Sequence, residues 1–72
     1  MYYVYILRIE NNKLYIGFTN NLKSRIRQHK NKKQCKLIYY EAYLSEKCAR
    51  DRERKLKYYG SAWRGLKKRI GA

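Results

Sequence analysis

Three polar side chains fall on helical faces where apolar residues would be expected. At roughly 100° per residue, Arg25 and His29 lie within about 60° of Leu22, on or beside the stripe that a helix there would bury. In a second predicted helix, Glu53 shares a stripe with Ala49. Such residues on inward faces are costly unless they are paired or put to use. Arg25, His29 and Glu53 are therefore the first candidates for chemistry.

These residue types suit the cleavage of a phosphodiester bond. A carboxylate holds a metal ion that polarises the phosphate, a guanidinium neutralises the developing charge, and a base or an oriented group activates water. The alternative is structural: a buried Arg25–Glu53 ion pair that joins two helices, with His29 as a neighbour. The positions alone leave both interpretations open.

The two cysteines, Cys35 and Cys48, indicate little chemistry. A zinc site needs about four Cys or His ligands, and the chain has no CxxC or HxxxH spacing. A cysteine nucleophile paired with His29 has no supporting spacing either. Two cysteines form no disulfide framework, which favours a reducing, cytoplasmic setting.

The chain is strongly basic. Its 72 residues include 19 Lys and Arg against 5 Asp and Glu, a formal net charge of +14. Each cation that neutralises a phosphate releases counterions, so this charge predicts salt-dependent binding to nucleic acid. The basic residues are spread along the chain among nine tyrosines and not gathered on one amphipathic face, which argues against a membrane surface. A merely solvated, solubilising surface is the alternative.

Length and composition predict one small folded domain over residues 1–72. The chain is 44% hydrophobic and 15% aromatic and has no proline, so it does not read as disordered. It has no run of about 18 apolar residues that would span a membrane. Its first residues lack the basic segment and the cleavage site of a signal peptide. These features agree with a cytoplasmic location.

The pattern of apolar residues predicts the element order ββαβαα. The first strand is apolar on both alternating faces, which places it in the middle of a sheet that is covered on both sides. An α+β fold follows, with a three-stranded mixed or antiparallel sheet flanked by helices. The expected N-caps are Thr19 or Asn20, then Ser45 and Ser61, and Gly60 is expected to stop the second helix. The predicted strands cover residues 2–9, 14–18 and 36–43, and the predicted helices cover residues 22–30, 46–58 and 62–70.

The first hairpin raises a question of register, because side chains on a strand alternate between faces. A two-residue loop would place Tyr5 and Tyr15 on opposite faces. A three-residue loop over residues 10–12 pairs Tyr5 with Gly17 and brings both tyrosines to one face. That loop needs a left-handed residue at its last position, which Asn12 provides. We therefore predict the three-residue loop, with Gly17 lacking a side chain so that it does not crowd Tyr5.

The chain resembles the GIY-YIG nuclease domain, in particular its small stand-alone bacterial members. The resemblance covers essentially the whole chain and is carried by Tyr3-Val4-Tyr5, by Tyr15-Ile16-Gly17, by Arg25 with His29, and by Glu53. It implies a three-stranded antiparallel sheet flanked by helices. It also implies cleavage of DNA with one divalent cation, Mg²⁺ or Mn²⁺.

The resemblance assigns a role to each site residue. Glu53 would hold the metal, Arg25 would bind the scissile phosphate, and His29 would assist near the nucleophile or the leaving group. The general base would be one of Tyr5 and Tyr15, with Tyr5 favoured, provided that Arg25 and the metal lower its pKa.

The sequence departs from the family pattern at two places. Tyr3 stands where the first glycine of the motif is expected, and the loop from residue 30 to residue 35 is short. The late asparagine of some members has no clear counterpart after Tyr58. The short loop bears on DNA contact more than on the metal site.

The expected partner is DNA, engaged by its structure more than by its sequence, because phosphate contacts carry no sequence information. A non-catalytic basic nucleic-acid-binding module on the same fold is the alternative, and an RNA-associated protein is a third possibility.

We expect Tyr39, Tyr40 and Tyr43 to pack on the sheet, and any exposed aromatic residue could stack an unpaired base. Tyr58, Tyr59 and Trp63 are expected to cluster at a helix joint. The candidate DNA contacts are Lys23, Arg27, Lys30, Lys32 and Lys33.

Overall fold

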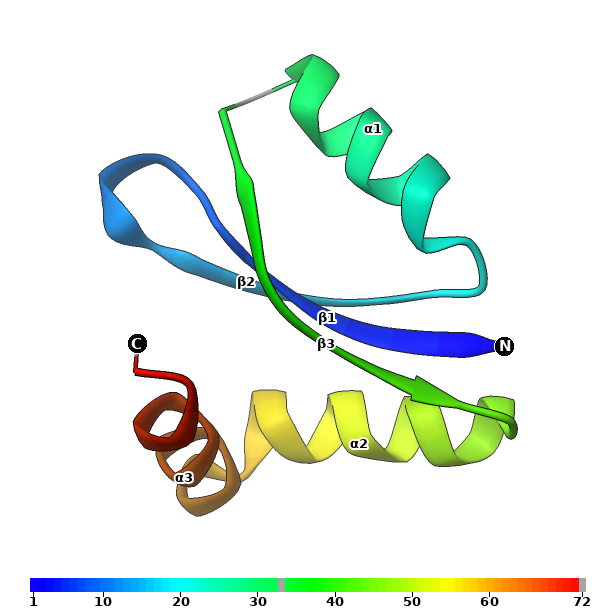
Figure 1. The fold of residues 1–72 in the computed structure, drawn as a ribbon. Helices are drawn as coiled ribbons and strands as arrows, with labels where there is room; N and C mark the ends of the chain where they lie inside the picture. Colours follow the sequence, from blue (N-terminus) through cyan, green and yellow to red (C-terminus); the bar gives the residue numbers. More distant parts are fainter. Residues whose placement is uncertain (33, 72) are drawn as a thin grey trace.

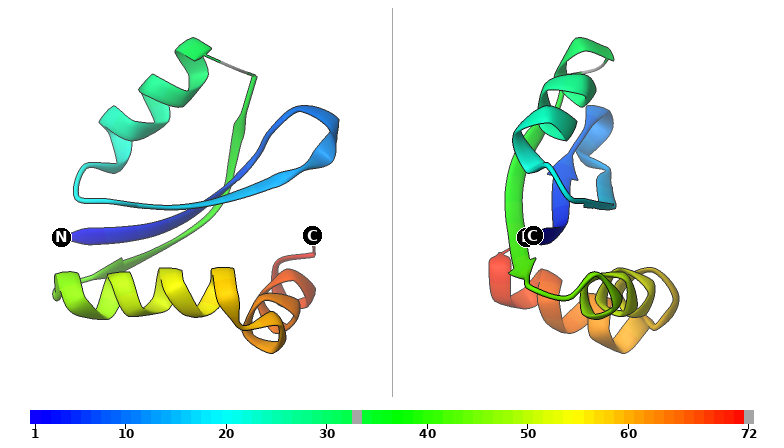
Figure 2. Two further views of the ribbon diagram at one scale, coloured as in Figure 1. Left: turned by 180° about the vertical axis from the view of Figure 1, so that it is seen from behind. Right: turned by 90° about the vertical axis from the view of Figure 1, so that its right-hand side faces the viewer.

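The computed structural model describes residues 1–32 and 34–71, without the side chain of Lys32. Three antiparallel strands form one sheet in the order β2-β1-β3. Helix α1 lies on one side of this sheet, and α2 and α3 lie on the other side (Figures 1 and 2). This is the predicted α+β fold with the order ββαβαα. The elements are β1 (Tyr2–Arg8), the 3-10 turn η1 (Glu10–Asn12), β2 (Leu14–Thr19), α1 (Leu22–Lys32), β3 (Lys36–Tyr43), α2 (Glu46–Tyr58) and α3 (Gly60–Ile70).

The core is built around β1, the central strand. Its residues from Val4 to Leu7 are all buried, although they alternate between the two faces of the sheet. Val4 and Ile6 pack with residues of α2 and α3, while Tyr5 and Leu7 face the α1 side. The prediction that an all-apolar first strand lies in the middle of a covered sheet is therefore confirmed.

The β1–β2 hairpin has the predicted register. Tyr5 pairs with Gly17, and Leu7 pairs with Tyr15, so both tyrosines lie on one face. Asn12 has the left-handed backbone that the three-residue loop requires, with φ 59°. Asn11 is also left-handed, with φ 63°, although only Asn12 was predicted to be so. Asparagine tolerates this conformation better than most residues, so the chain turns without a glycine.

The predicted helix ends need four corrections, one of which is that Ser61 lies inside α3 and is not its N-cap. Asn21 caps α1, because its Oδ1 accepts a hydrogen bond from the Ser24 amide at 3.1 Å, whereas Thr19 or Asn20 was expected. Helix α1 also runs two residues further than predicted, to Lys32. Gly60 does not separate α2 from α3 but begins α3, because Tyr59 takes an extended conformation that ends one helix and precedes the other. The Ser45 cap of α2 is confirmed by a hydrogen bond from the Cys48 amide.

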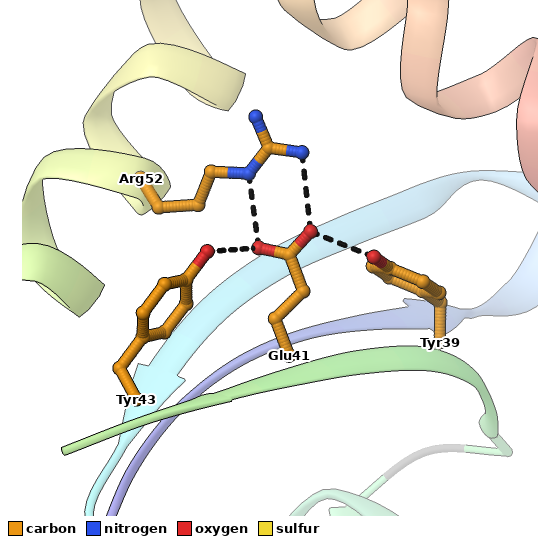
Figure 3. Close-up of polar contacts among 4 residues, drawn as sticks. All are labelled: Tyr39, Glu41, Tyr43 and Arg52. Atoms are coloured by element: carbon orange, nitrogen blue, oxygen red, sulfur yellow. Dashed lines mark hydrogen bonds and ion pairs between the residues drawn. The ribbon is translucent and has the colours of Figure 1, made fainter.

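Helix α2 is fixed to the sheet by contacts at both edge strands. The Arg50 guanidinium lies 4.6 Å from the centre of the Phe18 ring on β2. On β3, Glu41 accepts two hydrogen bonds from Arg52, at 2.9 and 3.1 Å (Figure 3). The rotation of α2 about its axis is therefore set by Arg50 and Arg52, and this rotation positions Glu53.

The Glu41 carboxylate is also bound by two tyrosine hydroxyls of its own strand. Tyr39 and Tyr43 donate hydrogen bonds to its two oxygens at 2.7 and 2.6 Å (Figure 3). Both rings pack against the core, as predicted for them. Tyr40 differs, because it is on the opposite face and is 52% exposed. Tyr58 and Tyr59 are exposed as well, so the predicted aromatic cluster with Trp63 at the helix joint is wrong.

Candidate active site

The candidate site is built around the ring of Tyr5 in the middle of the sheet. Tyr5 is fully buried, and its partner across β2 is Gly17. A Cβ placed at Gly17 would collide with the ring and hydroxyl of Tyr5, and would lie only 2.8 Å from the ring carbon Cε1. The glycine therefore leaves the space in which the Tyr5 side chain lies over β2.

Tyr15 and His29 complete an aromatic group with Tyr5. The ring centres of Tyr5 and Tyr15 lie 6.2 Å apart, and those of Tyr15 and His29 lie 5.1 Å apart. The Tyr5 hydroxyl and the His29 Nε2 share a hydrogen bond of 3.1 Å. Two strands and α1 thus bring together three of the predicted site residues, with Tyr5 buried and Tyr15 open to solvent.

Arg25 lies one helical turn before His29, but its side chain is exposed. Arg25 and His29 were both predicted on or beside the buried stripe of the first helix; His29 is half-buried, but Arg25 does not lie on the buried stripe. The positive charge of Arg25 still affects the site, because it acts to lower the pKa of the Tyr5 hydroxyl. An exposed guanidinium near a buried phenol is accessible to a phosphate from solvent.

Glu53 is supplied by α2, on the other side of the sheet from α1. Its side chain is 21% exposed, and its carboxylate forms an ion pair with Lys57 one turn later, at 3.1 Å between Nζ and Oε2. Its negative charge contributes to the raised pKa of Tyr5, which places it within electrostatic reach of that ring. Among the ion pairs of the described residues, Glu53 pairs with Lys57 and not with Arg25, so the structural alternative of a buried Arg25–Glu53 bridge is not found.

The electrostatics of the site keep Tyr5 protonated. Burial is the main cause that raises its pKa to about 12, with contributions from Tyr15 and Glu53, while Arg25 acts in the opposite direction. A phenol with this pKa is a weak proton acceptor at neutral pH unless its own proton can move elsewhere. His29 is the group at hydrogen-bond distance from the Tyr5 hydroxyl.

The residues present fit one divalent cation held by a single carboxylate. Mg²⁺ in phosphoryl-transfer sites is often bound through one or two carboxylates, with water and substrate oxygens as the remaining ligands. Glu53 is such a carboxylate: it is partly exposed, and its charge acts on the Tyr5 hydroxyl. Within residues 1–32 and 34–71 there is no group of three or more His, Cys, Asp or Glu that would form a cage made only of protein ligands.

The basic residues predicted to contact DNA lie mostly on α1. Lys23, Arg27 and Lys30 are exposed on this helix. Lys32 belongs to the same helix and not to the loop in which it was expected. Lys33 lies outside the described residues. The basic surface is thus carried on the element that also supplies Arg25 and His29.

Two ion pairs of α2 were not predicted from the sequence. The Glu53–Lys57 pair has the spacing of four residues that is typical of helical ion pairs, so the signal was present. The Glu41–Arg52 pair joins a strand to a helix, and no spacing rule indicates it. Such pairs depend on the packing of α2 against β3.

Comparison with known proteins agrees with this arrangement. The chain has an antiparallel sheet with helices on both faces, and Tyr5, Tyr15 and His29 meet on one of these faces. Residues 1–57 match the GIY-YIG catalytic domain, so the chain belongs to the GIY-YIG family. The match covers the five candidate site residues, and α3 lies beyond it.

Curated relatives carry names that state no activity. A UPF0213 protein of Clostridium perfringens is 39% identical, over 74% of this chain and 67% of the relative. One from Staphylococcus haemolyticus is 33% identical, over 81% of this chain and 82% of the relative. A UPF0213 protein of Autographa californica nuclear polyhedrosis virus is 57% identical over 49% of this chain and 34% of its own length. No solved structure gives a significant match.

No helix in the described part of the chain has the length and apolar character needed to cross a membrane.

Proposed function

We propose that this chain is a metal-dependent DNA endonuclease that hydrolyses phosphodiester bonds with one divalent cation. The observation that carries the proposal is the hydrogen bond between the Tyr5 hydroxyl and His29. The charges of Arg25 and Glu53 also act on the pKa of this hydroxyl. The membership of the GIY-YIG family supports the general chemistry. Glu53 would hold Mg²⁺ or Mn²⁺, which would supply Lewis-acid polarisation of the scissile phosphate.

The side chains of the site divide the remaining work. Arg25 would bind the phosphate and neutralise the charge that develops on its oxygens. Tyr5 would take a proton from the attacking water at its hydroxyl oxygen while its own proton passes to Nε2 of His29. This transfer explains how a phenol whose pKa is about 12 could act near neutral pH. Tyr15 would border the reacting water on the solvent side.

The substrate would be DNA recognised by its structure. The net charge of +14 and the exposed cations of α1 favour contacts with phosphates, which position a duplex without reading its bases. Strict sequence specificity would need a further element or a partner.

The test compares Glu53→Gln with Glu46→Gln in cleavage of labelled duplex and branched DNA. Glu46 is a matched control because it lies on the same helix, is exposed and pairs with Arg50. Glu53→Gln should reduce cleavage at least a hundredfold in Mg²⁺ or Mn²⁺, with salt-sensitive binding within about threefold of the unmodified chain. Glu46→Gln should cleave normally. A chain that binds DNA but cleaves none with either metal would be the non-catalytic module instead.

A further inference from the structure

Beside the candidate active site, the sheet carries an aromatic surface that the proposed chemistry does not use. Tyr40 on β3 pairs directly with Tyr5 on β1, so their side chains leave the sheet on the same face. Unlike Tyr5, Tyr40 is 52% exposed. The Tyr3 ring contacts it edge-on, with the ring centres 6.1 Å apart, and so supports it from one side. An exposed ring of this size held in place by another is a stacking surface.

A shallow pocket of about 360 Å³ opens over these two rings. It lies between β3 and the start of α1 and combines aromatic, amide and cationic groups. Its lining consists of Tyr3, Asn20, Asn21, Leu22, Lys23 and Tyr40. Asn21 uses its Oδ1 to cap α1, so its amide nitrogen is the group that it would offer to a ligand.

We propose that this pocket, referred to here as the Tyr40 pocket, binds an unpaired nucleobase of the DNA strand that is cut. The proposal rests on the proposed function, because it concerns the substrate of the same site. Stacking on Tyr40 requires a free base face, which a base inside an intact duplex does not offer. The preferred substrates would therefore be single-stranded, nicked, frayed or branched DNA.

Charge and position favour a nucleotide over other ligands. Lys23 lies in the pocket wall, and Arg27 and Lys30 follow on the same helix, so a strand that leaves the pocket along α1 would meet cations at its phosphates. An apolar or cationic partner would have no negative charges to pair with these cations, on a chain whose net charge is +14. Aromatic stacking with a cationic groove is the usual arrangement for single-stranded nucleic acid.

The distance to the active site also fits. Directly paired residues on neighbouring antiparallel strands lie about 5 Å apart, and successive nucleotides of a stacked strand rise by about 3.4 Å. A base on Tyr40 would thus belong to a nucleotide close to the scissile phosphate. The Tyr40 pocket would recognise where the pairing of the duplex ends and place that position beside Tyr5.

The experiment measures binding in EDTA, where no cleavage takes place. Fluorescence anisotropy with a labelled 12-nucleotide thymidine strand and with a blunt 12-base-pair duplex gives the two affinities. Tyr40→Ala should weaken binding of the single strand roughly tenfold and change duplex binding less than twofold. Tyr40→Phe keeps the ring and should bind like the unmodified chain. Tyr58→Ala removes an exposed tyrosine elsewhere, at the end of α2, and should change neither affinity.

A 2-aminopurine base within the single strand provides a direct readout of stacking. Its fluorescence should fall on binding to the unmodified chain and to Tyr40→Phe, and should fall much less with Tyr40→Ala. Equal weakening of both DNAs by Tyr40→Ala, or no weakening of either, would overturn the proposal. A change of oligomeric state in Tyr40→Ala would also overturn it, because this face would then bind a second copy. These measurements need no metal, so they stand apart from the Glu53→Gln test of cleavage.

Discussion

The ring of Tyr5 occupies the space in which a side chain at Gly17 would lie. Because the two residues pair across β1 and β2, this relationship joins the register of the hairpin to the geometry of the site. Tyr5 reaches His29 from this position. A glycine is needed at residue 17 for close approach and not for its backbone freedom, since positive φ angles occur elsewhere in the chain.

The first prediction follows from this contact. Gly17→Ala should destabilise the fold by about 1–3 kcal/mol, because the buried Tyr5 ring must move to admit the methyl group. Urea unfolding followed by circular dichroism measures the change. Gly65→Ala is the matched control, since Gly65 lies in α3 with open space around it. It should stabilise the fold by up to about 1 kcal/mol through helix propensity. Equal effects at both positions would contradict the close packing of Tyr5 and Gly17.

The hairpin was predictable because its constraints are local. The parity of the strands and the tolerance of Asn12 for a left-handed backbone fix the Tyr5–Gly17 pairing. The Ser45 cap and the bounds of β3 follow from local propensity in the same way. The site residues that these strands carry were therefore placed correctly on one face.

Features that depend on packing between elements were not predictable. A spacing of 100° per residue predicted Arg25 on or beside the buried stripe of α1. The exposure of Arg25 depends instead on how closely α1 packs against the sheet. The same holds for Tyr40, which shares the β-propensity of its neighbours and yet is 52% exposed on the α1 side of the sheet. The Glu41–Arg52 pair spans two elements and has no sequence signal.

The second prediction concerns acid stability. Burial alone would raise the pKa of Glu41, but the hydrogen bonds from Arg52, Tyr43 and Tyr39 and the charge of Arg52 outweigh it, and the pKa is lowered. A group whose pKa is lowered by folding stabilises the fold above its unfolded value, near 4.5, and this contribution is lost as the pH falls through the folded value. The free energy of unfolding should therefore decline below about pH 4.5.

Glu41→Gln tests the origin of that decline. It should lower the free energy of unfolding at pH 7 by at least about 1 kcal/mol, because the neutral amide leaves Arg52 without a charged partner. It should also flatten the decline in acid. Glu46→Gln removes an exposed helical pair and should change little. An unchanged acid profile in Glu41→Gln would show that other carboxylates cause the decline.

The third prediction concerns alkaline pH. Folding raises the pKa of Tyr5 from 10.0 to about 12, mainly through burial. The unfolded chain therefore loses this proton first, and the contribution of Tyr5 to stability is complete below about pH 10 and is lost as the pH rises toward 12. Tyr43 behaves in the same way, through burial and its hydrogen bond to Glu41.

Tyr5→Phe and Tyr43→Phe separate the two tyrosines. Each variant should show a shallower loss of stability between pH 10 and pH 12, with the larger change in Tyr5→Phe because Tyr5 is the more deeply buried of the two. Denaturant unfolding at fixed pH values measures the slope. Tyr58→Phe changes an exposed residue and should leave the slope as it is. A Tyr5→Phe slope that matches the unmodified chain would mean that Tyr5 ionises in the folded state near its ordinary pKa.

The last prediction concerns the ion pair that Glu53 makes with Lys57. A cation and the Lys57 ammonium would compete for the same carboxylate, so Lys57→Gln should tighten Mn²⁺ binding. Partly exposed pairs are worth about 0.2–1 kcal/mol, which corresponds to an increase in affinity of up to roughly fivefold. Titration of Mn²⁺ monitored by electron paramagnetic resonance measures this affinity.

Lys55→Gln removes the same charge from α2 at an exposed residue that forms no ion pair among the described residues, and should have a smaller effect. Equal effects of the two substitutions would mean that only net charge matters, and loss of all Mn²⁺ binding in Glu53→Gln would place the cation at this carboxylate.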